Sequence, residues 1–220
     1  MRWPKENLMK NYILKGSVQA TALCLVLGIA GLAKADEVHF TGSTLGQFNA
    51  QAYGATNSIF GLSYSNSTFD NTTVGGSLDL GGDPAPGSNF NNLGSFTLAN
   101  TDAVYDGNTF SVKVTFTAPS SIVGGDNATF TDILSGTVSG GVGGAFVDFD
   151  NTPQTFTFSN AQATGTFTMF VNDVSIAPGQ DATITAHITA NQTAVPEPTA
   201  IAGIGCGLLG LFGMRRKRSA

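Results

Sequence analysis

The feature that most constrains the fold is an alternation of apolar and polar residues along short stretches of chain. In residues 110–117, four apolar side chains alternate with four polar ones (FSVKVTFT). A period of two places the two sets on opposite faces of a β-strand, whereas a helix would scatter both around its circumference. Residues 154–159, 166–171 and 182–188 show the same alternation. We therefore expect an all-β domain over residues 36–190.

Turn-forming residues between these stretches predict how the strands connect. Asp106-Gly107 supplies the positive φ of a tight turn, so residues 102–105 are expected to form a hairpin with residues 110–117. Asn151-Thr152-Pro153 predicts a second hairpin, between residues 145–150 and the strand that follows. About eight to ten short strands fit this spacing, which is typical of an antiparallel β-sandwich of jelly-roll or immunoglobulin-like type. A β-barrel is the alternative.

Residues 57–92 carry the weakest strand signal. Ser, Asn, Thr and Gly dominate this part of the chain, and the Gly- and Pro-rich residues 81–87 are typical of an exposed loop. The domain also has no fixed repeat period. A solenoid or β-helix is therefore not favoured, because those folds stack units of constant length.

Charge and cysteine content exclude two further classes. Residues 36–194 contain 13 acidic residues and a single basic residue, Lys113, which gives a net charge of −12. Nucleic acid is excluded as a partner, because phosphate binding requires clustered Lys and Arg. Both cysteines, Cys24 and Cys206, lie outside this stretch, so the domain cannot be a disulfide-stapled scaffold.

Residues 1–35 have the three parts of a secretory signal peptide. A basic segment precedes the mostly apolar residues 18–33, and Ala33-Lys34-Ala35 supplies the small-x-small pattern that signal peptidase accepts. We expect export by the Sec machinery and cleavage before Asp36. An uncleaved N-terminal anchor is the alternative, but the apolar run is short for a bilayer core of about 30 Å.

The C-terminus combines a polar linker with a Pro-Glu-Pro motif (residues 191–198), an apolar run (199–214) and a basic tail (215–220). The motif is Pro196, Glu197 and Pro198, and the basic residues are Arg215, Arg216, Lys217 and Arg218. As a transmembrane-like helix at about 1.5 Å per residue, the apolar run would reach roughly 24 Å, less than a full membrane span. The basic residues favour the cytoplasmic side and would stop transfer there.

This tail resembles the PEP-CTERM sorting signal of Gram-negative bacteria and cyanobacteria, over about residues 195–219. Tails of this kind are also named ice-binding protein C-terminal domains, a name that implies nothing about the domain that precedes the tail. In that family the Pro-Glu-Pro motif is recognised by an exosortase, a membrane transpeptidase. The resemblance implies that the chain is held transiently in the inner membrane, cut near the motif and passed to the cell surface or extracellular matrix. A plain membrane anchor is the alternative.

Catalytic and metal-binding residues are sparse. His39 and His187 are the only histidines, and the sequence lacks a Gly-x-Ser-x-Gly nucleophile elbow, so an enzyme is not expected. No cofactor is expected, with calcium as the one candidate. Asp148, Asp150 and Asn151 place oxygen ligands of the kind that calcium prefers at the entry to a turn. The alternative is that Asp148 and Asp150 are simply the outward residues of a strand.

Threonines alternate at Thr155-x-Thr157, Thr166-x-Thr168 and Thr183-x-Thr185. Such residues could form a flat, regular face of the kind used against ice or a polysaccharide. The alternative is the ordinary exposed side of a sheet, where threonine is common, because nothing in the sequence requires the rows to align.

Two classes of function remain. One is a structural or adhesive, non-catalytic protein of the cell surface or exopolysaccharide matrix. The other is a carbohydrate- or calcium-binding surface module, with a hydrolase less expected. The tyrosines discriminate between them: a surface cluster of Tyr53, Tyr64 or Tyr105 would favour sugar stacking, whereas buried rings would favour a structural role.

Overall fold

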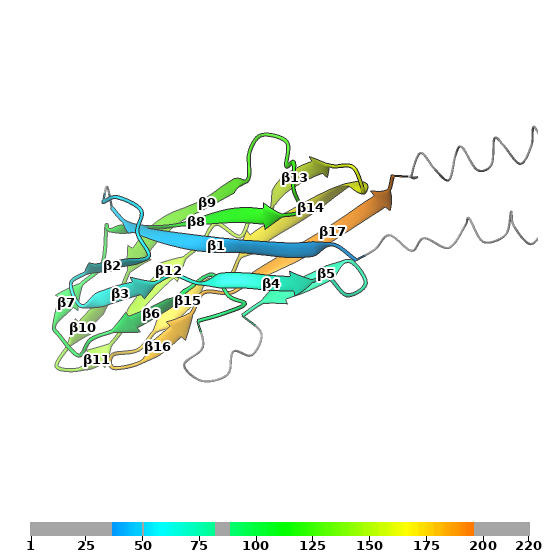
Figure 1. Cartoon of the computed structure of the whole chain (residues 1–220). Coiled ribbons are helices and arrows are strands. Elements are labelled where there is room, and N and C mark those ends of the chain that lie inside the picture. The colour runs from blue at the N-terminus through cyan, green and yellow to red at the C-terminus, as the bar shows by residue number, and fades with distance from the viewer. Residues whose placement is uncertain (1–36, 50, 82–88, 196–220) are drawn as a thin grey trace, which may run out of the picture. The chain divides into compact units, whose positions relative to one another are not determined.

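The computed structural model describes residues 37–49, 51–81 and 89–195 (Figure 1). These residues are all-β and contain no helix, and every pairing between their 17 strands is antiparallel. The expected signal peptide, Pro-Glu-Pro motif, apolar helix and basic tail lie outside the described residues. Within the described part of the chain, no helix is long and apolar enough to span a bilayer.

The strands form four sheets. The largest has the order β15-β12-β9-β8-β1-β4, formed by Val174–Ile176, Ala145–Asp148, Asn127–Ser135, Thr109–Ala118, His39–Phe48 and Thr68–Thr72. A four-stranded sheet has the order β13-β14-β17-β5, formed by Gln154–Ser159, Ala163–Val171, Ala186–Ala194 and Ser77–Leu80. A second has the order β16-β6-β3-β2, formed by Asp181–Thr183, Ser95–Leu98, Leu62–Ser65 and Thr56–Ile59. The smallest has the order β11-β10-β7, formed by Val142–Gly143, Thr137–Ser139 and Ala103–Val104.

Aromatic side chains join the six-stranded sheet to both four-stranded sheets. Phe40 on β1 meets Phe167 on β14 edge to face, with ring centroids 5.0 Å apart. Phe110 on β8 lies 5.2 Å from the ring of Tyr64 on β3. Such ring pairs add to the stabilisation that burial of apolar area provides. The six-stranded sheet therefore forms one layer of the core, and the two four-stranded sheets cover it.

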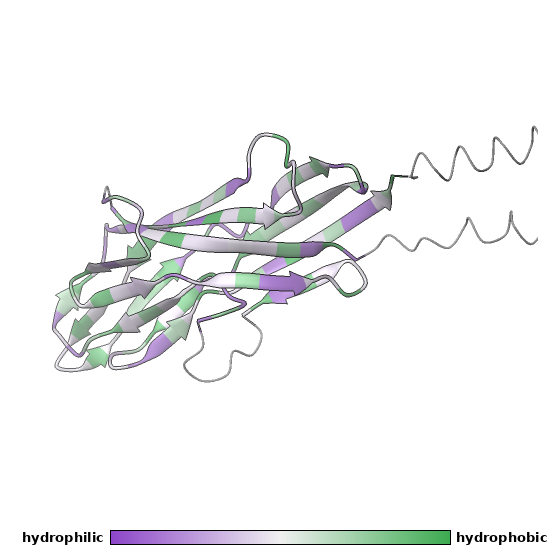
Figure 2. Ribbon diagram, in the orientation of Figure 1, coloured by the Kyte–Doolittle hydropathy of each residue, from purple (hydrophilic) through white to green (hydrophobic). Residues whose placement is uncertain are grey.

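Figure 2 shows hydrophilic and hydrophobic residues along the strands, and the burial of the strands follows the alternation seen in the sequence. On β8 the four apolar residues of the 110–117 stretch are buried, and on β14 the inward residues alternate with residues that are partly or fully exposed. The buried set on these two strands is Phe110, Val112, Val114, Phe116, Phe167, Met169 and Val171. The fold class predicted from periodicity is therefore confirmed as all-β and antiparallel, although the strands outnumber the expected eight to ten.

The first predicted hairpin is wrong in its partner. Asp106-Gly107 does form a turn, with φ of +81° at Gly107, but β7 before it pairs with β10 instead of β8. The backbone N–H of Tyr105 donates to the Gly136 carbonyl at 2.9 Å, and the Asp106 carboxylate accepts from the Gly136 N–H at 2.9 Å. These bonds tie the segment before the turn to a different sheet.

The second predicted hairpin is also wrong. Strand β12 pairs with β9 and β15, whereas β13 pairs with β14. Residues 151–153 therefore connect two sheets on opposite layers of the core. Strand β17 also extends through Ala194, so residues 191–194 of the expected linker are strand residues.

Strand β1 was not expected, because glycines interrupt its inward-facing apolar pattern. A Cβ added at Gly42 would lie 2.3 Å from the Phe69 ring, and one added at Gly46 would lie 2.3 Å from the Tyr64 ring. Both positions face the core and accept an aromatic ring from a neighbouring strand. The ring fills the space that an apolar side chain would occupy, so the strand is buried without an apolar period of its own.

Candidate functional site

Uncharged polar residues line the outward side of the β13-β14-β17-β5 sheet. The strand registers place ten of them in three rows: Ser159, Thr164 and Thr193; Thr157, Thr166 and Asn191; Thr155, Thr168, Thr189 and Ser77. We call this set the hydroxyl face. Two of the three predicted threonine pairs thus align on neighbouring strands, whereas Thr183 lies in the β16 sheet and Thr185 between the two sheets.

The alternation of each strand holds these side chains outward. On β14, Phe167 and Met169 are buried, which directs Thr166 and Thr168 to the opposite side. Neighbouring strands lie about 4.8 Å apart, and successive outward residues are separated by about 6.8 Å along a strand. Hydroxyl groups therefore repeat in two dimensions over an uncharged surface.

Most hydroxyls of the hydroxyl face are free to bond outside the protein. Two of them are bonded inside it: Thr166 donates to the Asn191 side chain at 3.1 Å, and the Thr189 hydroxyl lies 3.2 Å from Nε2 of His187. The other Ser and Thr hydroxyls of the face have no hydrogen-bond partner among the described residues. These groups can donate to and accept from a ligand without breaking a bond inside the protein.

The outer side of the six-stranded sheet is different, although it is also rich in Ser and Thr. There the hydroxyls bond across strands: Thr41 with Thr117 at 2.6 Å, Ser111 with Thr131 at 2.7 Å, and Thr115 with Asn127 at 2.7 Å. Charged residues also lie on that side, including Lys113 and Asp70, whose carboxylate lies 2.7 Å from Nε2 of His39. The two outer surfaces therefore differ in hydrogen-bonding capacity and in charge.

The hydroxyl face ends in a row formed by Phe170, His187 and Asp79. Nδ1 of His187 lies 2.6 Å from the Asp79 carboxylate, and the Phe170 and His187 rings are 5.4 Å apart. With Thr189 on Nε2, these contacts have the connectivity of a nucleophile-base-acid triad. Because β17 is paired on both sides, by β14 and β5, its backbone N–H groups are bonded in the ladders and offer no oxyanion hole here. Asp79 could not be found from the sequence, since it lies 108 residues from His187.

The positions of the calcium candidates agree with the alternative, in which Asp148 and Asp150 are simply outward residues of the chain. Asp148 and Asp150 are exposed, and Phe149 between them is buried on the other side. Hydrogen bonds from the Thr152 hydroxyl, and then from its backbone N–H, lower the pKa of Asp150. The Asn151 amide donates to Asp173 at 3.3 Å. Among the described residues there is no group of three or more His, Cys, Asp or Glu side chains arranged for a metal, and the calcium site stays a prediction.

The tyrosines do not form a surface cluster. Tyr64 is 1% exposed and Tyr105 is fully buried, whereas Tyr53 is 36% exposed and lies near Lys113. The Tyr64 hydroxyl donates to Oγ1 of Thr44 at 2.8 Å, and burial raises the pKa of Tyr64 to about 12. The burial of Tyr64 and Tyr105 therefore favours a structural role for these rings over sugar stacking.

Comparisons of the chain with protein-family models, curated proteins and solved structures found no match. The geometry of the hydroxyl face therefore carries the functional argument.

Proposed function

We propose that this chain is an exported, non-catalytic adhesive protein of the bacterial surface or exopolysaccharide matrix. The N-terminal signal directs it out of the cell, and an exosortase processes it at Pro196, Glu197 and Pro198. Its domain is a β-sandwich of jelly-roll or immunoglobulin-like type. The single observation that supports adhesion is the hydroxyl face, whose side chains repeat in register across three strands, with one row reaching the fourth.

An uncharged polysaccharide fits this face chemically. Sugar hydroxyls both donate and accept hydrogen bonds, as threonine hydroxyls and the Asn191 amide do. The threonine methyl groups are apolar and can contact the C–H faces of sugar rings. The net charge of −12 over residues 36–194 opposes binding of polyanionic polymers and favours a neutral one.

Two measurements test the proposal. Cells with and without the exosortase are fractionated, and the chain is followed by immunoblot. We expect it in the surface or matrix fraction when the enzyme is present and in the inner membrane when it is absent. An identical distribution in both strains, with a mass that includes Ala220, would contradict the sorting step.

Adhesion is tested with the purified protein and the insoluble matrix polysaccharide, with microcrystalline cellulose as a second polymer. A variant carrying Thr155→Val, Thr157→Val and Thr168→Val keeps the strand preference and shape but removes three hydroxyls that have no partner among the described residues. At about 1 kcal/mol for each lost hydrogen bond, binding should weaken on the order of 100-fold. Thr117→Val with Thr129→Val, on the six-stranded sheet, is the matched control and should bind normally. Partition of the protein into growing ice without polymer binding would refute the polysaccharide assignment.

A further inference from the structure

The two four-stranded sheets share one continuous run of chain, residues 181–194. Only Ile184 and Thr185 separate β16 from β17, and both keep hydrogen bonds to neighbouring chain segments. The Ile184 N–H donates to the Gly94 carbonyl at 2.8 Å, and the Thr185 carbonyl accepts from the Asn172 N–H at 3.0 Å. In Figure 1, β17 continues the direction of β16. This run therefore acts as one long strand that belongs to both sheets.

The alternation of this long strand keeps one phase over its length. The even-numbered residues from Ile184 to Ala190 are buried, so the odd-numbered residues from Thr183 to Thr193 lie on the outer side. The register extends this side onto β6, β3 and β2, in a row formed by Thr183, Ser95, Ser65 and Thr56. We call this the distal row. Like the rows of the hydroxyl face, it holds uncharged residues only.

The polar outer surface is longest along this strand. Successive outward residues are about 6.8 Å apart, so Thr189 to Thr193 of the hydroxyl face covers about 14 Å, whereas Thr183 to Thr193 covers about 34 Å. Across the strands, a row of three or four residues at about 4.8 Å spacing covers only about 10–14 Å. An extended ligand that uses most of these polar groups must therefore lie parallel to β17.

An aromatic ring lies on the outer side between the hydroxyl face and the distal row. Phe170 on β14 pairs with His187 in the register, and their rings are 5.4 Å apart. Met169 and Val171 on either side of Phe170 are buried, which directs the Phe170 ring outward, where it is partly exposed. Among the described residues, this ring does not pack against the buried core. It offers an apolar platform for the C–H face of a sugar ring.

We propose that a neutral polysaccharide chain lies along residues 183–193, parallel to β17, with one of its sugar rings stacked on Phe170. The chain contacts the hydroxyl face on one side of Phe170 and the distal row on the other. The ligand is therefore an extended stretch of polymer, not a chain end or a short oligosaccharide. The carboxylates of Asp79 and Asp181, on the same outer side, select against anionic polymers. This inference rests on the proposed function, because it assigns the length and direction of the ligand of the hydroxyl face.

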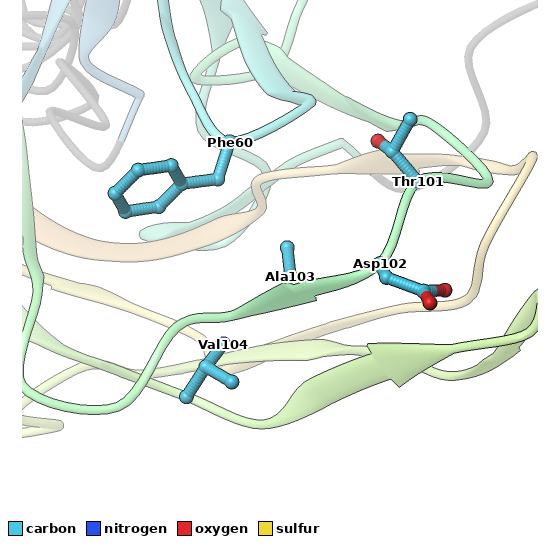
Figure 3. A pocket seen from close by; sticks show the side chains of 5 residues that line it. All are labelled: Phe60, Thr101, Asp102, Ala103 and Val104. Carbon is cyan, nitrogen blue, oxygen red and sulfur yellow. The ribbon is translucent and has the colours of Figure 1, made fainter.

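The exposed ring of Phe60 lies outside this path and provides a control. It is 61% exposed at the β2–β3 turn and lines a hollow of about 340 Å³ with Ala103 and Val104 of β7 (Figure 3). The Thr101 and Asp102 side chains at this hollow point away from the ring. Phe60 has φ of +49°, which asparagine tolerates well, so Phe60→Asn removes an exposed phenylalanine and preserves the turn.

The test measures binding as a function of ligand length. Two neutral series, cello-oligosaccharides and oligosaccharides released from the matrix polysaccharide, are titrated calorimetrically into the purified full chain, from disaccharide to hexasaccharide. We expect the affinity to rise at least about tenfold over a series, because only the longer ligands reach both sides of Phe170. Phe170→Val keeps the strand preference and should weaken hexasaccharide binding about tenfold. Thr183→Val with Ser95→Ala, on the distal row, should weaken hexasaccharide binding several-fold and leave disaccharide binding unchanged.

The control Phe60→Asn should bind every ligand as the parent does, and melting temperatures verify that each variant is folded. Hexasaccharide binding no tighter than disaccharide binding, or equal affinity of the parent and Phe170→Val, would overturn the inference. If the parent still binds the polymer and the triple valine variant of the hydroxyl face loses it, the proposed function stands without the inference. If the parent binds neither the polymers nor any oligosaccharide, both are wrong.

Discussion

Substitution of Gly46 by Ala should destabilise the domain, although alanine is normally better than glycine in a strand. The Tyr64 ring lies between two glycines. A Cβ at Gly46 would come within 2.3 Å of its Cδ1, and one at Gly94 within 2.4 Å of its Cε2. The ring cannot move aside, because its hydroxyl is bonded to Thr44 and to the Leu93 carbonyl.

The expected magnitude follows from two opposing effects. Replacing a strand glycine by alanine stabilises by about 0.5–1 kcal/mol through reduced chain entropy. Overpacking of a filled core costs about 1–3 kcal/mol. The midpoints of these ranges give a net loss of about 1 kcal/mol, which lowers the melting temperature by roughly 2–4 °C for a domain of this size.

Thermal and urea unfolding of Gly46→Ala, measured by circular dichroism, provides the assay. The paired control is Tyr64→Leu, alone and combined with Gly46→Ala, because leucine lacks the ring atoms that the new methyl group would meet. In the Tyr64→Leu background, the added methyl should be neutral or stabilising. A Gly46→Ala protein as stable as the parent would show that the glycine is not required by the ring.

Three further predictions concern the core and the calcium candidates. As the pH rises, Tyr64 should lose its proton at a lower pH in the unfolded chain than in the folded domain, because burial raises the pKa of Tyr64 to about 12. The stability that neutral Tyr64 contributes should therefore be complete below about pH 10 and fall by up to about 3 kcal/mol as the pH rises to 12. Urea unfolding measured at several alkaline pH values tests this, and Tyr64→Phe should make the free energy of unfolding depend less on pH. Thr44→Val should cost about 2 kcal/mol in urea unfolding, because the buried Ser67 N–H loses its 2.9 Å bond to Oγ1 of Thr44, and an unchanged midpoint would refute this. Calorimetric titration should show calcium affinity no tighter than about 1 mM, because Asp150 already accepts from Thr152 and the Asn151 amide bonds Asp173. Tighter binding that Asp150→Asn abolishes would establish the calcium site instead.

The parts of the fold that could be predicted from sequence are those that depend on local periodicity. The faces of β8, β13, β14 and β17 follow from alternation along each strand, because a period of two leaves one arrangement that buries the apolar set. Strand β1 escaped prediction because Gly42 and Gly46 stand where apolar residues would. Their role depends on rings contributed by β3 and β4, which no local pattern shows.

The strand partners and the site required long-range information. A turn at Asp106-Gly107 fixes where the chain reverses, but the sheet that receives each side depends on hydrogen bonds such as that from Tyr105 to Gly136. The threonine pairs were visible as separate motifs. Their alignment into rows depends on the register between β14 and β17, which matches Thr168 to Thr189.

The position of Lys113 has a practical consequence. It is the only lysine between residues 36 and 194, and its strand β8 belongs to the six-stranded sheet, on the opposite layer of the core from the hydroxyl face. Coupling through side-chain amines would therefore attach the domain to a bead, a sensor chip or another macromolecule in one orientation, with the hydroxyl face turned away from the support. A layer of domains coupled to one support in this way has a single sense, with all its threonine rows facing outward.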